Sequence, residues 1–185
     1  MEESGKEPSP PKLLLTRLSD GHCPCITRAF GRYLAEAASV CLHHHDQILV
    51  RRVEVVGDFE ASFLLRRLAV SDQMSRTLAD LTVTTELGAV AIAILLVEEL
   101  TEYQAVYRSA TSTGIDYWLA DQDDEELGLT ARLESSGLLD GGEVQRKRRI
   151  REKLKQTERS DATGLPVVVV VVDFRDLVAE VAKRS

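Results

Sequence analysis

The sequence predicts an α/β protein with a mixed central sheet flanked by helices. Residues 167–172 are six consecutive valines, and such an unbroken β-branched run suits a central strand that is covered on both faces. Three upstream segments also have strand character, and apolar and polar residues alternate in the second and third of them. These segments are residues 103–109, 114–120 and 130–138.

Helices are predicted on either side of the three strand segments. The first is apolar nearly all round, is capped by Thr84 or Thr85 and runs to about Leu100. Its most apolar part, residues 87–97, is about half as long as a membrane span, so we expect a buried core helix and no membrane association. The second is a long charged helix over residues 143–159. The core order is therefore helix, three strands, helix, strand.

The N-terminal part is predicted to add a helix and a hairpin to this core. Gly57 and Asp58 lie between two strand-like segments and form a two-residue hairpin signal. Ser71 is a suitable N-cap for a short helix. The segments are a helix over residues 26–43, strands over 48–56 and 59–65, and the short helix over 71–80.

We therefore divide the chain into three parts. Residues 1–15 are expected to be a disordered tail, because the first dozen residues are polar and rich in proline. Residues 16–81 form the extension, and residues 82–185 form the core. A final short helix is predicted over residues 175–183.

Charge and cysteine usage restrict the classes of function. The net charge of −7 argues against a protein that coats nucleic acid by electrostatics alone, although residues 145–155 form a local basic segment. Such a segment is also typical of the solvated face of a helix.

The odd cysteine count and the polar N-terminus, which does not resemble a leader, predict a reducing cytoplasm. A zinc site is an alternative suggested by soft ligands, but one residue between the two thiols of Cys23 and Cys25 is a poor spacing. The candidate donors are His22, Cys23, Cys25, Cys41, His43, His44 and His45.

Two acidic residues are the strongest candidates for a functional site. Asp116 and Glu134 lie on the second and third strand segments, where the strand period would let both side chains project from neighbouring strands. Carboxylate oxygens are the ligands that hard divalent cations prefer. The pair therefore predicts a metal site.

The element order, with one acid on each of these two strands, resembles the restriction-endonuclease-like nucleases, the PD-(D/E)XK superfamily. The resemblance covers residues 84–174 and makes residues 82–185 a nuclease-like core. It implies that Asp116 and Glu134 bind Mg²⁺ or Mn²⁺, that Glu86 on the preceding helix assists, and that the reaction is phosphodiester hydrolysis of DNA. It also implies a possible homodimer, because many nucleases of this type cut both strands as dimers.

The chain departs from the family pattern at the lysine of the E-X-K motif, where Ser136 stands. Serine carries no positive charge and cannot replace a lysine that orients the attacking water. The spacing of Val144, Lys147, Arg151 and Leu154 predicts that Lys147 leans toward the sheet as a migrated lysine, with Arg146 and Arg149 facing solvent. Arg132 is a second candidate, because it points to the same side of its strand as Glu134.

Structural explanations stay open for each acid. Glu86 would be favoured in the first turn of its helix by the helix dipole. Asp116 could satisfy turn amides after Gly114-Ile115, and Glu134 could belong to a structural ion pair. The alternative to an enzyme is therefore a catalytically inactive nuclease-fold module that binds a protein or a nucleic acid.

Overall fold

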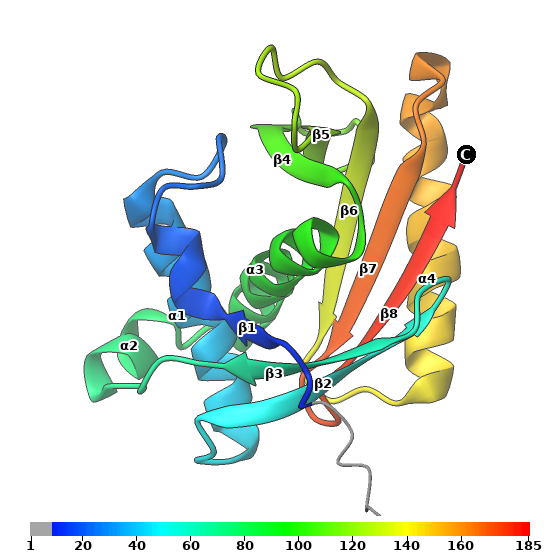
Figure 1. The fold of residues 1–185 in the computed structure, drawn as a ribbon. Helices are drawn as coiled ribbons and strands as arrows, with labels where there is room; N and C mark the ends of the chain where they lie inside the picture. Colours follow the sequence, from blue (N-terminus) through cyan, green and yellow to red (C-terminus); the bar gives the residue numbers. More distant parts are fainter. Residues whose placement is uncertain (1–8) are drawn as a thin grey trace, which may run out of the picture.

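Eight strands form a single curled, mixed sheet in residues 9–185, the part of the chain that the structure, a computed structural model, describes (Figure 1). Their order across the sheet is β1-β3-β2-β8-β7-β6-β5-β4. The strands are β1 (Lys12–Leu14), β2 (Val50–Gly57), β3 (Ala61–Arg66), β4 (Tyr103–Arg108), β5 (Tyr117–Asp121), β6 (Ala131–Leu138), β7 (Val167–Asp173) and β8 (Val178–Arg184). The described residues also form four α-helices and two 3-10 helices: η1 (Leu15–Ser19), α1 (Arg28–His45), α2 (Asp72–Thr77), α3 (Leu81–Leu100), α4 (Glu143–Thr157) and η2 (Glu158–Thr163). The α/β prediction is confirmed.

Strand β7 is the buried centre that the valine run predicts, and its side chains alternate between two apolar clusters. Val168, Val170 and Val172 belong to the large core on the α3 side, whereas the intervening valines pack with Ile150 of α4. The sheet curls around α3, with α1 outside α3, and α4 lies on the opposite face (Figure 1). Side chains of β6 and β7 that face α4 are therefore separated from the main core.

Strands β4 to β7 form the half of the sheet that carries the candidate residues. β4, β5 and β6 pair antiparallel in sequence order, and β6 pairs parallel with β7. A parallel neighbour needs a crossover connection, and α4 supplies it. Helix, three strands, helix and strand thus follow one another as the sequence predicts.

The apolar helix begins earlier than predicted. Asp80, rather than Thr84 or Thr85, caps α3, because its carboxylate accepts hydrogen bonds from the backbone N–H groups of Thr82 and Val83. By length and composition α3 could cross a membrane, but it is mostly buried under α1 and the sheet. Its packing is that of a core helix, as predicted.

The C-terminal segment is a strand, so the prediction of a helix over residues 175–183 is wrong. β7 turns back through a tight loop in which Leu177 has a positive φ of 51°, and β8 pairs antiparallel with β7. The residues predicted as a short helix form a strand instead, because tertiary pairing outweighs local propensity. β8 also pairs parallel with β2, and this pairing joins the N-terminal hairpin to the core sheet.

The N-terminal hairpin is present with a longer turn than predicted. β2 and β3 pair antiparallel up to Val55 and Ala61, so five residues lie between the last pair instead of the predicted two-residue turn. Ser71 caps α2 as predicted. β1 lies within the part predicted as a disordered tail and pairs with β3, and its Leu13 is fully buried. The remainder of that prediction, over residues 1–8, lies outside the described residues.

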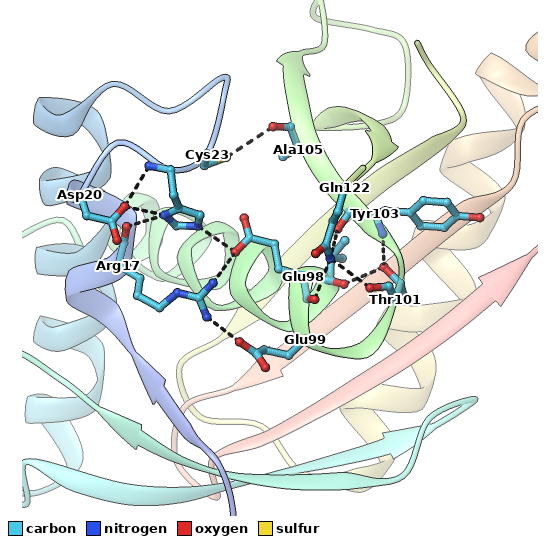
Figure 2. Close-up of polar contacts among 11 residues, drawn as sticks. Arg17, Asp20, Cys23, Glu98, Glu99, Thr101, Tyr103, Ala105 and Gln122 are labelled. Atoms are coloured by element: carbon cyan, nitrogen blue, oxygen red, sulfur yellow. Dashed lines mark hydrogen bonds and ion pairs between the residues drawn. The ribbon is translucent and has the colours of Figure 1, made fainter. Parts of the chain in front are cut away.

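A polar network holds the loop after η1 against the end of α3 (Figure 2). Arg17 bridges Glu98 and Glu99, and His22 lies between Asp20 and Glu98. Burial alone would lower the pKa of His22, but hydrogen bonds to the two carboxylates raise it above its usual value. Both ring nitrogens of His22 are therefore engaged in this network.

The same loop decides the geometry behind the zinc alternative. The Sγ atoms of Cys23 and Cys25 lie 3.9 Å apart, and Cys23 bonds to the carbonyl of Ala105. The other predicted donors, from Cys41 to His45, lie at the C-terminal end of α1, far along the helix from this loop. No group of three or more His, Cys, Asp or Glu side chains in residues 9–185 is arranged to hold a metal ion.

Candidate functional site

The pairing register of β5 and β6 brings the two predicted acids together. The last ladder pair joins Tyr117 with Leu133, the residues that adjoin Asp116 and Glu134. The backbone N–H of Asp116 donates to the carbonyl of Leu133 at 2.8 Å, one residue out of that register, so the two segments stay in contact past the start of β5. Glu134 faces α4, where Lys153 contacts it, and Asp116 lines the same pocket as Glu134 and Gln156.

Glu134 is a buried carboxylate with one oxygen left over. Its side chain is 2% exposed. Oε1 accepts hydrogen bonds from Lys153 Nζ at 2.6 Å and from Gln156 Nε2 at 2.9 Å. Oε2 is buried and has no hydrogen-bond partner among the described residues. A buried unpaired carboxylate oxygen is costly, so this atom is a candidate ligand for something that the folded chain does not itself provide.

The electrostatic environment of Glu134 favours a neutral carboxyl or a bound cation. Burial raises the pKa of Glu134, the nearby charge of Asp116 raises it further, and Lys153 opposes both, so the pKa stands at about 7. Two acids in one site with one pKa strongly raised is the pattern expected where a positive charge is missing.

Asp116 is held by Ser135, the residue that follows Glu134. Oδ2 of Asp116 accepts hydrogen bonds from the backbone N–H of Ser135 at 2.8 Å and from its hydroxyl at 2.6 Å. Both donors belong to β6 and not to the turn before Asp116. The contact fixes the carboxylate against β6 and leaves its second oxygen for another partner.

A pocket of about 340 Å³ opens over the two acids. The connection between β4 and β5 forms one wall, and the other consists of Gln156 at the end of α4 and Arg159 of η2. Arg108 and Arg159 line the pocket, are exposed, and make no ion pair within the described part of the chain. The pocket thus combines two carboxylates with two guanidinium groups that form no ion pair within residues 9–185, and that of Arg108 also lies 5.7 Å from the centroid of the Phe30 ring.

Gly114 allows the two walls to meet. Its φ is +80°, and a Cβ at this position would lie 2.2 Å from the carbonyl oxygen of Gln156. Only a residue without a side chain fits here, because both the conformation and the space exclude one.

Gly114→Ala should lower the free energy of unfolding by about 2 to 4 kcal/mol, combining left-handed strain with overpacking. The matched control is Gly164→Ala, where φ is +66° but nothing lies within 4 Å of the added Cβ, so only the strain of about 1 to 2 kcal/mol applies. Urea denaturation of both variants checks the difference. Equal losses in the two variants would contradict the close contact between Gly114 and α4.

The structure places Lys147 away from the pair, so the prediction that its ammonium lies near the carboxylates is wrong. Lys147 is 59% exposed and pairs with Glu143 on the same helix. The prediction took Val144 as a buried anchor, but Val144 is 76% exposed. The face of α4 that meets the sheet is offset from the predicted one, and it carries Arg146, Ile150, Lys153 and Thr157.

Lys153 is the residue that sequence reasoning missed. It approaches Glu134 from α4, in the place where the migrated lysine was expected. Helical spacing from Ile150 instead of Val144 predicts that Lys153 faces the sheet, since residues three apart on a helix are neighbours on one side. The expected exposure of Arg146 and Arg149 is also wrong. Arg146 is buried against Asp173, and Arg149 bonds to Ser136 at 2.7 Å.

Arg132 points to the same side as Glu134, as predicted, but it has other partners. Its guanidinium is buried and donates to the carbonyls of Thr157 and Leu165 and to Ser160. These bonds tie β6 to the end of α4 and η2. Arg132 therefore supports the frame of the pocket and does not reach into it.

Glu86 is not brought to the pair. Its oxygens accept hydrogen bonds from the Ser136 hydroxyl and from the Gly137 N–H, both at 3.2 Å, and Arg149 lies 3.6 Å away. It lines a different pocket, next to Gly137 and Leu139. Because α3 begins at Leu81, Glu86 is also beyond the first turn, so the helix dipole does not explain it.

Comparison of the chain with models of known protein families, with curated proteins and with solved structures found no match. The functional argument therefore depends on the site itself: Asp116, Glu134, Lys153 and the pocket above them.

Proposed function

We propose that this protein is a restriction-endonuclease-like nuclease that hydrolyses phosphodiester bonds of DNA with Mg²⁺ or Mn²⁺. The observation that carries the proposal is the orphan Oε2 of Glu134, buried beside Asp116 while Lys153 contacts the other oxygen. A buried carboxylate with a raised pKa and a free oxygen is what a cation-binding site has before the cation binds.

The order and pairing of the elements support the proposal. α3, the antiparallel β4–β5–β6 meander, the α4 crossover and the parallel β7 follow the succession that the family resemblance implies. Glu134 lies on the third strand of that succession, and Asp116 directly precedes the second, β5. The three-stranded N-terminal addition and β8 extend the sheet beyond this core.

The residues present fit a hard divalent cation. Asp116 and Glu134 each offer a carboxylate oxygen that has no other partner in the described part of the chain, and oxygen ligands suit Mg²⁺ and Mn²⁺. Two protein carboxylates are also the usual number for a Mg²⁺ site that acts on phosphates. When bound, the cation would neutralise charge on the phosphate and lower the pKa of a coordinated water. Glu86 is left out of the proposed ligand set because it is bonded to Ser136 and Gly137.

Lys153 takes the role of the missing E-X-K lysine in this proposal. Its ammonium is a compact charge with three donors, of which one bonds to Glu134 and a second to Gln156 Oε1 at 3.4 Å. The third donor is suited to hold a water or a phosphate oxygen next to the carboxylates. Arg108 and Arg159 would bind flanking phosphate oxygens at the pocket walls.

A catalytically inactive binding module is the second candidate, and one observation favours it. The Lys153–Glu134 pair is closed at 2.6 Å and the third acid, Glu86, is engaged elsewhere, so the site holds together without any cation. On this reading the acids and Lys153 serve only to stabilise the fold. The two candidates differ in whether the chain cleaves DNA.

Lys153→Ala should lower Mg²⁺-dependent cleavage of a supercoiled plasmid about a hundredfold or more, in the range typical of a general acid–base group. The matched control is Lys147→Ala on the same helix, which should cleave like the unaltered chain because Lys147 is exposed and remote from the pair. Gel assays of both variants with Mg²⁺, Mn²⁺ and EDTA test this. Absence of cleavage by the unaltered chain with either metal would reject the nuclease and leave the binding module.

Location and assembly remain parts of the proposal. The three cysteines carry no disulfide, which suits the reducing cytoplasm expected from the sequence. A homodimer that cuts both strands is expected from the resemblance, and sedimentation velocity with and without DNA would measure it.

A further inference from the structure

The cations of α4 and η2 fall into two groups, and the second group has no structural partner. Residues 143–159 contain eight Lys or Arg side chains. Five of them form ion pairs: Arg146, Lys147, Arg148, Arg149 and Lys153. The other three are exposed and form no ion pair with any of residues 9–185: Arg151, Lys155 and Arg159.

Arg151 and Lys155 are four residues apart on α4, so they are neighbours on one side of the helix, and each such step rises about 6 Å. Arg159 follows four residues later in η2, so the three cover about 12 Å along the segment. We call Arg151, Lys155 and Arg159 the α4 stripe. Its last member, Arg159, lines the pocket over Asp116 and Glu134, so the stripe leads to the candidate site.

The stripe has no explanation in the stability of the fold. Like charges four residues apart destabilise a helix by a few tenths of a kcal/mol. The chain has 30 acidic residues and 23 basic ones, so acidic partners are abundant. The neighbouring cations Lys147 and Arg148 of α4 form ion pairs with such residues. An exposed row of unneutralised cations in an acidic protein is suited to an external polyanion.

We propose that the α4 stripe binds the phosphate backbone of a nucleic-acid strand and leads it into the pocket between Arg108 and Arg159. A strand presents one phosphate per about 3.4 Å of helix axis, so 12 Å of stripe corresponds to three or four phosphates. The inference rests on the proposed function, since the reacting phosphate would be the one that reaches Asp116 and Glu134. The α4 stripe is then the surface that holds the substrate, and the feature of the substrate that it recognises is the row of phosphates.

The test compares two double variants of the full chain that remove the same charge. Arg151→Gln/Lys155→Gln removes two members of the stripe, and Lys147→Gln/Arg148→Gln removes two exposed, ion-paired cations of the same helix. Binding to fluorescently labelled duplex DNA, single-stranded DNA and single-stranded RNA is measured by anisotropy in EDTA, at salt concentrations from about 50 to about 200 mM.

The stripe variant should raise Kd about tenfold or more at about 0.1 M salt and reduce the slope of log K against log salt by about 1.8 on duplex DNA. The control variant should change Kd less than about threefold. The nucleic acid that loses most affinity identifies the natural class of strand. Equal losses in the two variants, or no salt-dependent binding of any strand by the unaltered chain, would overturn the inference.

Cleavage is measured separately, so failure of this inference and failure of the proposed function can be distinguished. A chain that cleaves DNA with Mg²⁺ and binds equally well without the stripe keeps the proposed function and loses the strand path. A chain that binds through the stripe but never cleaves keeps the strand path and loses the nuclease.

Discussion

Glu134→Gln is expected to abolish Mg²⁺-dependent DNA cleavage, with a loss of about a thousandfold or more. The substitution keeps the side-chain volume and the hydrogen-bond acceptor for Lys153, but it removes the charge that a hard cation requires. Loss of several kcal/mol of charge stabilisation at the reacting phosphate gives a rate effect of this size. Asp116→Asn should have an effect of the same order, because it removes the partner carboxylate.

Asp123→Asn is the control for this experiment. Asp123 is an exposed acid on the connection between β5 and β6 and does not line the pocket over Asp116, so its isosteric change should leave cleavage unaltered. Isothermal titration with Mg²⁺ provides a second measurement that does not depend on finding the right DNA. If Glu134→Gln binds Mg²⁺ as the unaltered chain does, then Glu134 is not a ligand.

The second large effect is on stability and depends on pH. In the unfolded chain Glu134 ionises around its usual pKa of 4.5, whereas in the folded chain its pKa is about 7. Between these values the folded state holds the proton that the unfolded state has lost, so raising the pH favours unfolding. The contribution of Glu134 to stability is fully present below about pH 4.5 and is lost by about pH 7. The total change is on the order of 3 kcal/mol.

Glu134→Gln cannot ionise at this position and should not show this loss. The free energy of unfolding of the variant should therefore exceed that of the unaltered chain by on the order of 3 kcal/mol more at pH 8 than at pH 4.5. Guanidinium denaturation across this range measures the difference. Asp116→Asn should reduce the pH dependence, because it removes a charge that raises the pKa of Glu134. A pH-independent difference between Glu134→Gln and the unaltered chain would contradict the raised pKa.

Divalent metal should reverse this pH effect if the proposed site binds it. Mg²⁺ would compensate the negative charges of buried Glu134 and half-buried Asp116 at pH 8, and the gain in unfolding free energy should disappear in Glu134→Gln. The same titrations thus separate a metal site from a purely structural ion pair between Glu134 and Lys153.

Several parts of the fold were determined by local sequence. The valine run specified the buried strand β7, because apolar β-branched side chains on both faces of a strand favour a position in the sheet that is covered on both sides. Alternation along β6 was sufficient to point Glu134 and Arg132 to one face, since a strand has a fixed side-chain period of two, and the pairing of β5 with β6 brought Asp116, the residue before β5, to the same pocket. Ser71 capped its short helix for a purely local reason.

The tertiary structure decided what depends on partners distant in sequence. The rotation of α4 places Lys153 on Glu134 and Lys147 in solvent, and it follows from the packing of Ile150 on the valines of β7. Helical spacing predicts which residues of α4 share a face but not which face packs on the sheet. The helix is so polar that its few apolar residues do not define the buried side.

The same reasoning applies to β8 and to Glu86. Residues 178–184 became a strand because β7 and β2 each had a free edge for them to pair with, and no local preference for a helix could match those ladders. Glu86 lies away from the acids because Ser136 and Gly137 of β6 offered it two donors. Local sequence thus determined the strands β4 to β7 and the neighbouring positions of the two acids, because the periodicity of a strand is a local property. Which charged side chains meet those acids was decided only when the helices packed on the sheet, because that choice depends on the rotation and start of each helix.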